Sequence, residues 1–378
     1  MKLPYVIRTV LLLSILFTAL ITKAQQNDDL LNVLIKKGIV TQQEADSIRA
    51  DQAFKEQKKK DQDKENQHGI TIGSRALQIS GLIQTEYEGF QQTGVNNTFL
   101  LHRARLDVKG DINDNWNYEV YTEFAGTTKL LDAYTTYKIA DFLKFTAGQF
   151  KVPFSLESLI ADSQLDFIDR SQVVNALAGR STDVIGNQNG RDIGIQINGS
   201  FVKVDGRYLF DYTLGVFNGA GYDVTTDNNG HKDIAGRFSV HPINNLTVSG
   251  DFYDGQGNYG TPAKNYLRNR GGFDARYVIG GLALQAEYDK GTDGTIKRDG
   301  WYGQATYFVL PNKLQLAAKY DTYDPNEITK NVRTNYYTGG VNYFFNNWAK
   351  LTVDYIDRRE EVTQIKNNIF EAQLQLTF

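Results

Sequence analysis

The chain has 378 residues, of which 41% are hydrophobic, 22% charged and 12% aromatic, and its formal net charge is −3. The absence of cysteine excludes a disulfide framework, a thiolate metal site and a cysteine nucleophile. With Gly 34, Tyr 22 and Phe 21 against Pro 6 and Met 1, the composition is typical of a strand-rich, turn-rich chain and excludes disorder and collagen. A nucleic-acid binder normally carries a clear basic excess, which this chain lacks.

Residues 1–24 have the pattern of a secretory signal peptide. Lys2 and Arg8 precede an apolar run from Val10 to Ile21, and cleavage is predicted after Ala24. The alternative is a membrane anchor, but a run of about 12 apolar residues is shorter than the ~20 that span a bilayer. We therefore expect export.

Residues 25–68 differ in composition from the rest and are predicted to be helical. Gly38 can end a first helix, and Thr41 with Glu44 forms a capping box for a second. The charged tract KEQKKKDQDKENQ follows. Two interpretations stay open: a periplasmic helical or coiled-coil segment that helps assembly, or a solvated tether.

From Ala76 onward the sequence divides into sixteen segments of about ten residues in which every second side chain is apolar. Each segment therefore has one apolar and one polar face. In the second segment the two faces are Leu100, Ala104, Leu106 and Val108 against Arg103, Arg105, Asp107 and Lys109.

The connections between these segments alternate between short and long. Short ones include residues 111–115, Gly280 and residues 346–347, whereas long ones include 91–97, 219–230, 255–269 with its GQGNYG stretch, and 324–332. The longest is Lys151–Gly190. Bacterial outer-membrane barrels have this parity, with tight periplasmic turns and long external loops.

Charged side chains recur on the face opposite the apolar one. Burying so many charges in a dry core would cost several kcal/mol each, so this face is predicted to line water and the apolar face to contact lipid. The predicted lumen residues are Arg103, Arg105, Lys109, Glu119, Asp132, Lys138, Arg237, Asp251, Arg276, Glu287, Lys319, Asp321, Lys350 and Asp354. The fold class is thus all-β: over 69–378 we predict a 16-stranded antiparallel transmembrane β-barrel in the bacterial outer membrane, in contact with its lipid.

Aromatic residues mark one end of the predicted barrel. Trp116, Phe345, Trp348 and Phe378 fall beside predicted periplasmic turns or the terminus, where an aromatic girdle belongs. The last strand ends on Phe378 and resembles the terminal strand that the barrel-assembly machinery recognises.

Three blocks between Leu101 and Arg191 resemble the phosphate-selective porin O/P family: HRARLDVKGDINDNWNYEVYTEFA, GQFKVPFSLES, and LDFIDRSQVVNAL before GRDIG. The resemblance implies a homotrimeric, 16-stranded channel whose third external loop, here 151–190, folds into the lumen as a constriction. It also implies passive diffusion of small anions such as phosphate, and no cofactor.

In that family, lumen arginines feed an anion constriction that lysines and loop residues complete. The matching positions here are Arg103, Arg105, Lys151, Asp169 and Arg170. Guanidinium groups at a narrow aqueous path offer fixed donors to an anion. The alternative for Arg103 and Arg105 is a structural pairing with Asp107, Glu119 or Glu123.

The net charge of the barrel region leaves a general porin open. From residue 69 onward there are 30 Lys and Arg (41 less 11) and 35 Asp and Glu (44 less 9), a net charge of −5. A barrel plugged by its own loop is a further alternative.

Catalytic and metal-binding residues are not indicated by the sequence. His102 is expected to face lipid or the interface, and neither it nor His68, His231 or His241 is expected beside a Ser or Asp in the lumen. Asp and Asn residues in the loop at 223–229 offer calcium ligands, but their spacing favours solvated turns.

Overall fold

The computed structural model describes residues 37, 69–72, 75–179 and 190–378. The predicted signal peptide and, apart from Lys37, the predicted helical segment at 25–68 lie outside the described residues. Among the described residues, no helix is long and apolar enough to cross a membrane.

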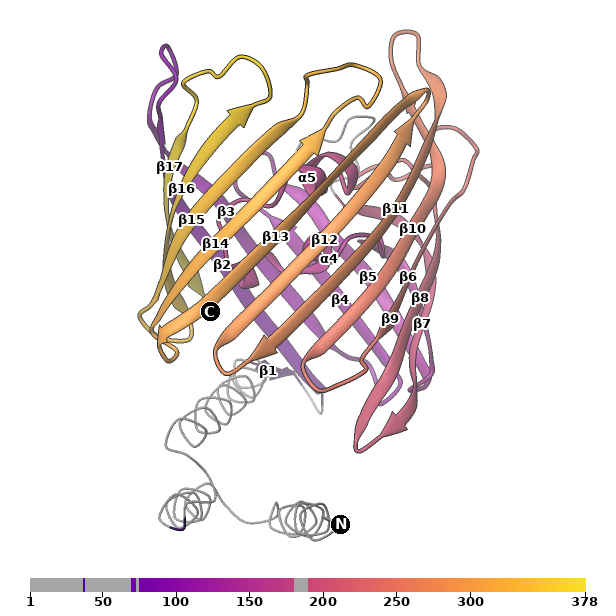
Figure 1. Ribbon diagram of the computed structural model, residues 1–378. Coiled ribbons are helices and arrows are strands. Elements are labelled where there is room, and N and C mark those ends of the chain that lie inside the picture. Colours follow the sequence, from indigo (N-terminus) through magenta and orange to yellow (C-terminus); the bar gives the residue numbers. More distant parts are fainter. Residues whose placement is uncertain (1–36, 38–68, 73–74, 180–189) are drawn as a thin grey trace, which may run out of the picture. The chain divides into compact units, whose positions relative to one another are not determined.

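Sixteen antiparallel strands close into a barrel, as the alternation predicts (Figure 1). Each strand from β2 to β17 pairs with the next along the chain, and β17 pairs back with β2. The strands are β1 (Gly69–Ile72), β2 (Arg75–Phe90), β3 (Thr98–Asp111), β4 (Trp116–Glu123), β5 (Lys129–Ala140), β6 (Leu143–Lys151), β7 (Arg191–Val204), β8 (Arg207–Phe217), β9 (Asp233–Val240), β10 (Leu246–Tyr259), β11 (Lys264–Ile279), β12 (Leu282–Asp293), β13 (Ile296–Leu310), β14 (Leu314–Asp324), β15 (Thr334–Phe344), β16 (Ala349–Glu360) and β17 (Ile369–Thr377).

The seam between the first and last barrel strands has two unpredicted features. The short strand β1 pairs with the start of β2, on the edge that β17 covers further along. Phe378 exchanges two backbone hydrogen bonds with Gly81, of 2.7 and 3.1 Å. A Cβ on Gly81 would lie 2.3 Å from the Phe378 ring, so glycine makes room for the terminal aromatic side chain.

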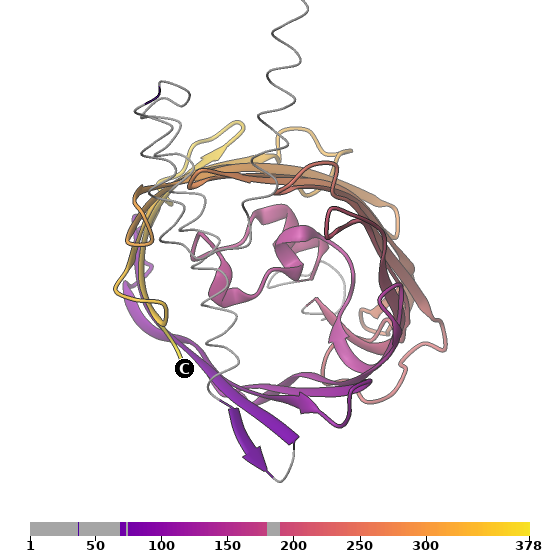
Figure 2. The same ribbon diagram turned by 90° about the horizontal axis from the view of Figure 1, so that it is seen from below.

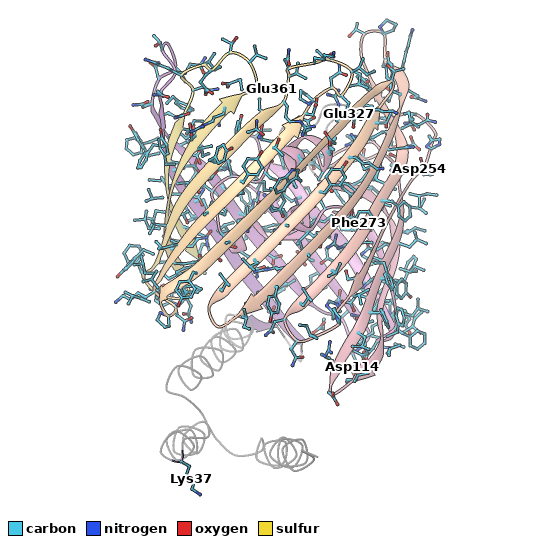
Figure 3. The ribbon with its side chains drawn as sticks, viewed as in Figure 1. Lys37, Asp114, Asp254, Phe273, Glu327 and Glu361 are labelled. Carbon is cyan, nitrogen blue, oxygen red and sulfur yellow. The ribbon has the colours of Figure 1, made fainter. Side chains whose placement is uncertain are left out.

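Apolar side chains cover the outside of the barrel and polar ones its inside. Phe273, 72% exposed, projects from the outer wall (Figure 3). On the inner face, seven predicted lumen charges are more than nine-tenths buried. Asp132 is paired with Arg191. The loop described below packs over the other six, which are Asp251, Glu287, Lys319, Asp321, Lys350 and Asp354. The prediction of an apolar outer face and a charged inner face is therefore confirmed, but the prediction that these seven side chains line water is wrong.

The prediction of a long loop at 255–269 is wrong. Strand β10 continues to Tyr259 and β11 starts at Lys264, so only residues 260–263 form the turn. This hairpin has no apolar alternation to reveal it, because it extends beyond the part of the barrel that needs an oily face. Backbone pairing and the Tyr259 and Tyr266 rings, 4.4 Å apart, hold it together.

The predicted orientation of His102 is also wrong. The pairing of β3 with β2 skips His102, because Gln84 opposes Arg103 and Thr85 opposes Leu101. Such a bulge shifts the alternation by one residue. Leu100 consequently opposes Glu86 on the inner face, although it was predicted on the oily face, and His102 Nδ1 contacts the Glu86 carboxylate.

The segment after β6 folds into the barrel (Figure 2). Its described part, residues 152–179, contains α4 (Leu156–Leu159), the 3-10 turn η1 (Asp162–Gln164) and α5 (Gln172–Leu177). We call residues 152–179 the inner loop. The Ser155 side chain caps α4 by accepting from the Ser158 N–H.

Helix α5 packs against the strands β12, β13 and β14. The spacing of Val173, Val174 and Leu177 places them on one face of that helix, and all three are buried. Together with wall aromatics such as Tyr302 they form a hydrophobic cluster inside the barrel. One side of the lumen is thus filled.

Candidate functional site

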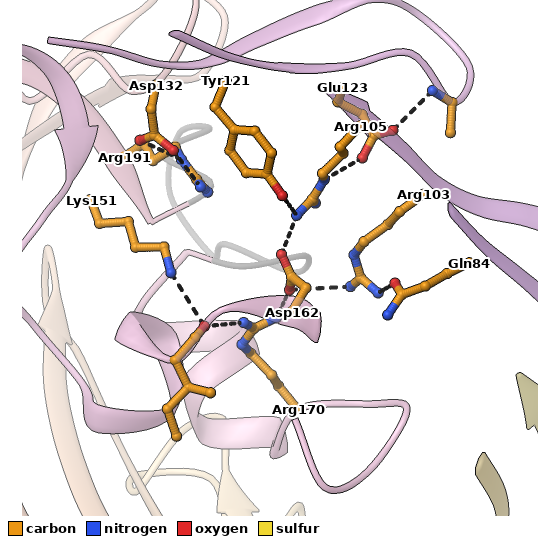
Figure 4. A network of polar contacts seen from close by, with 12 residues as sticks. Gln84, Arg103, Arg105, Tyr121, Glu123, Asp132, Lys151, Asp162, Arg170 and Arg191 are labelled. Atoms are coloured by element: carbon orange, nitrogen blue, oxygen red, sulfur yellow. Dashed lines mark hydrogen bonds and ion pairs between the residues drawn. The ribbon is translucent and has the colours of Figure 1, made fainter. Parts of the chain in front are cut away.

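Three arginines converge on one carboxylate where the inner loop meets strand β3 (Figure 4). Arg105 and Arg170 each contact Asp162 through Nη1, and Arg103 Nη2 lies 3.5 Å from Asp162 Oδ1. We call Arg103, Arg105, Arg170 and Asp162 the arginine cluster. Arg103 and Arg105 come from β3, whereas Arg170 and Asp162 come from the inner loop.

Each arginine of the cluster has a second partner. Arg103 Nη1 donates to Gln84 Oε1 at 2.6 Å, and Arg105 Nε donates to Glu123 Oε2 at 2.6 Å. Arg170 donates to the carbonyls of Glu157 and Ile160 at 3.0 and 2.9 Å. The alternative pairing of Arg105 with Glu123 therefore occurs, but at the same time as its contact with the loop.

Lys151 completes the group from the end of β6. Its ammonium donates to the carbonyls of Leu159 and Ile160 at 2.9 and 3.2 Å. Arg191, at the start of β7, instead forms a two-bond pair with Asp132 at 3.0 and 2.8 Å. Such a bidentate pair is self-contained.

The arginine cluster and Lys151 carry an excess of positive charge. Counted by direct contact, three arginines and one lysine stand against two carboxylates, Asp162 and Glu123, which leaves four minus two, or +2. In a site shielded from bulk water such an excess acts over a longer distance than it does in solution. The region can therefore attract anions, although the barrel as a whole is acidic.

Asp169 interacts electrostatically with Arg103, but it is not the carboxylate that Arg103, Arg105 and Arg170 contact. Its backbone carbonyl accepts from Lys319 Nζ at 2.7 Å on the opposite wall. Its carboxylate interacts electrostatically with Glu88 and Glu371. Asp162, which the sequence did not single out, is the carboxylate that the three arginines share.

The wall opposite β3 binds the backbone amides of the inner loop. Four wall carboxylates each accept from one loop N–H over 2.8–3.0 Å, in the pairs Ser155 with Asp251, Glu157 with Glu287, Ile168 with Asp354, and Gln172 with Asp321. Hydrogen bonds to charged acceptors are stronger than neutral ones. These acids therefore serve as anchors for the loop.

Donors from the same wall bind the carbonyls of the loop. Besides Lys319, Lys350 Nζ donates to Leu165 at 2.8 Å, and Asn342 Nδ2 donates to Asp166 at 2.8 Å. The loop is thus bound on both its amides and its carbonyls. That satisfaction of backbone groups explains how an irregular segment can lie inside a barrel.

An open space lies on the same strands as the arginines of β3. A cavity of about 350 Å³ is lined by residues of β2 to β5, among them Lys109, Glu119 and Tyr134. Lys109 is four residues from Arg105 on β3, towards the short turns. The side of the lumen opposite α5 therefore retains room for water and small solutes.

Three histidines lie beside carboxylates, contrary to the prediction, and of these His231 Nδ1 lies 3.4 Å from Asp233 Oδ1. His102 contacts Glu86, and His241 Nε2 lies 2.8 Å from Asp211 Oδ2. The other ring nitrogen of His241 lies 2.9 Å from Thr247 Oγ1, at the short-turn end of the barrel. A bulge and a turn, which the alternation does not reveal, bring these groups together.

A family model describes nearly all of the barrel. The model for phosphate-selective porin O and P matches residues 78–245 and 244–378. The chain belongs to this family. It is therefore an outer-membrane porin, located in the outer membrane, and the short-turn end of the barrel is its periplasmic end.

Solved structures similar to this porin share its fold at low sequence identity. The outer membrane channel DcaP of Acinetobacter baumannii has a TM-score of 0.61 at 12% identity, with 82% of this chain and 99% of that one covered. An anion-selective porin from Comamonas acidovorans has 0.60 at 14%, with 81% and 100% covered. The trimer form of OmpT from Vibrio cholerae has 0.58 at 16%, also with 81% and 100% covered. No curated protein matches the porin by sequence.

Proposed function

We propose that the porin is a passive diffusion channel for small anions such as phosphate. The observation that carries the proposal is the charge of +2 that the arginine cluster, Glu123 and Lys151 leave beside the open side of the lumen. The anion-selective porin from Comamonas acidovorans, which has the same fold, is in line with it.

In this proposal the guanidinium groups act as exchangeable donors. An anion that reaches the cluster competes with Asp162 for the N–H groups of Arg103 and Arg105, which are already held in place by Gln84 and Glu123. A phosphate offers charged oxygen acceptors that the planar guanidinium group of arginine binds in pairs. Because the donors are shared with a resident carboxylate, binding stays weak enough for release.

A general, weakly selective porin is the second candidate, favoured by the net charge of −5 from residue 69 onward. Four of the acids, however, accept hydrogen bonds from the inner loop, which reduces what they contribute to the field along the path. The cavity beside β2 to β5 argues against a barrel plugged by its own loop.

The test is the reversal potential of the refolded porin in planar bilayers under a KCl gradient. We expect preference for anions, and we expect Arg103→Glu with Lys151→Glu to shift it towards cations, because the two changes alter the local charge by four units. Phosphate titrated into the bath should reduce the chloride current of the unchanged porin.

The matched control makes the same charge changes at exposed residues of the periplasmic end, in Lys203→Glu near the end of β7 with Lys313→Glu in a turn. It should leave the reversal potential unchanged. A large conductance with no ion preference in the unchanged porin would establish the general porin instead, and no conductance would establish the plugged barrel.

We further propose that the porin is a homotrimer and that assembly machinery recognises Phe378. A trimer form exists for OmpT, which has this fold. On the outer wall a hollow of about 720 Å³ is lined by residues of β11 to β16, and small residues such as Ala286, Gly303 and Ala318 lie among larger tyrosines. Small residues allow close approach of a neighbouring barrel.

We infer no enzymatic role, because passage through the lumen needs no bond to break.

A further inference from the structure

Three glutamates form a cluster on the lumen wall at the barrel seam. Glu86 and Glu88 lie on β2, and Glu371 lies on β17 directly opposite Glu88. One carboxylate oxygen of each lies within 4.8 Å of the others. β2 ends two residues after Glu88 and β17 starts two residues before Glu371, so the cluster lies near the external mouth.

Two of these carboxylates are buried with an oxygen that has no donor. Glu86 and Glu371 are each 2% exposed, and Glu86 Oε1 and Glu371 Oε2 have no hydrogen-bond partner. A buried, unpaired carboxylate costs several kcal/mol, and like charges at this separation add to the cost. Something that is positive must therefore offset these oxygens.

The neighbouring protein groups supply only part of that compensation. Gln373 Nε2 donates to Glu86 Oε2 at 2.7 Å, and His102 contacts the same oxygen, so both groups act on the oxygen that is already paired. Arg358 interacts electrostatically with Glu88, but Asp169 adds a further negative charge facing Glu88 and Glu371.

We propose that Glu86, Glu88 and Glu371 bind a hard divalent cation of the Ca²⁺ class at the external mouth of the lumen. Carboxylate oxygens are the ligands such ions prefer, and Ca²⁺ accepts six to eight oxygens in flexible geometry, so water can complete the shell. Glu88, which is half-buried, gives the ion access from the lumen.

The site links the external medium to the anion path. A bound divalent cation offsets two negative charges at the mouth that an incoming anion must pass. It also joins the first and last barrel strands at their external ends. Binding of the ion does not depend on the proposed anion function, because the ligands are separate from the arginine cluster.

The test is equilibrium dialysis of the refolded, chelator-treated porin against radioactive Ca²⁺. We expect one ion per chain with a dissociation constant of ~10⁻⁴–10⁻³ M, the range of extracellular calcium modules. Glu88→Gln should weaken binding at least about tenfold, since it removes one of three charged ligands. Glu371→Gln should do the same. Glu119→Gln, a lumen glutamate on the periplasmic side, should bind as the unchanged porin does.

A second measurement separates the ion from a shared proton. Ca²⁺ added on the external side should raise the ratio of anion to cation permeability in the unchanged porin and have less effect in Glu88→Gln. No binding up to ~10 mM Ca²⁺, or equal binding by the unchanged porin and both glutamine variants, would overturn the proposal. If no Ca²⁺ binds, a proton shared among the three carboxylates would be what offsets their negative charge.

Discussion

The two sides of the lumen use charge in opposite ways. On the side of β3, three arginines share the single carboxylate of Asp162, and an open space lies further along the same strands. On the side of β10 to β16, carboxylates are buried under the inner loop and accept from its amides. The total charge of the barrel therefore says little about the field that a solute meets, because many of its acids are hydrogen-bonded where no solute passes.

The largest expected effect comes from releasing the loop from the acidic side, in Asp321→Ala with Asp354→Ala. Each change leaves a loop N–H, of Gln172 or of Ile168, without its charged acceptor. Hydrogen bonds to charged groups contribute about 1.5–3 kcal/mol each, so the free energy of unfolding should fall by roughly 3–6 kcal/mol. Thermal unfolding in detergent measures this, and open-channel current noise should rise as the loop moves.

The control for this pair is Asp111→Ala with Asp114→Ala, which removes two carboxylates at an exposed periplasmic turn. It should change the stability by no more than ~0.5 kcal/mol, as surface substitutions usually do. If the Asp321→Ala with Asp354→Ala variant had the same stability and the same open-channel current noise as this control, the wall carboxylates would not be anchors of the inner loop.

The barrel could be predicted from sequence because its signal is repeated. Alternation, loop parity and the charged inner face each recur in strand after strand, so errors at single positions do not matter. The departures are local. The bulge at His102 shifts one residue in β3, and the β10–β11 hairpin extends where no lipid demands an apolar face.

The site could be predicted only in part, for a different physical reason. Arg103 and Arg105 face the lumen by periodicity, and the family resemblance added Lys151 and Arg170. Asp162 lies in an irregular loop, where spacing does not determine which side chain points where. Only the backbone path of the inner loop makes Asp162, and not Asp169, the carboxylate that the three arginines contact.

A moderate effect is expected at Asp289, on the acidic side. Its side chain is fully buried and neither carboxylate oxygen has a partner. Its Oδ1 and that of Asp251 would each lie within 2.4 Å of a Cβ on Gly272, so they share one space. In Asp289→Asn the repulsion is removed and the amide can donate to Asp251. We expect a gain of about 1–3 kcal/mol in the free energy of unfolding.

Thermal unfolding of Asp289→Asn beside Asp132→Asn tests this directly. Asp132 is also buried but is paired with Arg191, so its substitution should lower the stability. A loss at Asp289 as large as that at Asp132 would mean that Asp289 has a positive partner outside the protein chain.

The smallest expected effect is on ion selectivity, from a substitution in the arginine cluster. Asp162→Asn removes one negative charge and raises the local excess from +2 to +3. A single charge in a partly solvated site contributes ~0.5–1 kcal/mol, so the ratio of anion to cation permeability should rise roughly two- to fivefold. Asp166→Asn removes the same charge from the same loop, but Asp166 accepts from Gln304 and Gln315 and not from an arginine. Its effect on the reversal potential should be smaller. Equal shifts in the two variants would mean that the loop acts through its total charge, whereas a larger shift at Asp162 would locate the anion path at the arginines that share it.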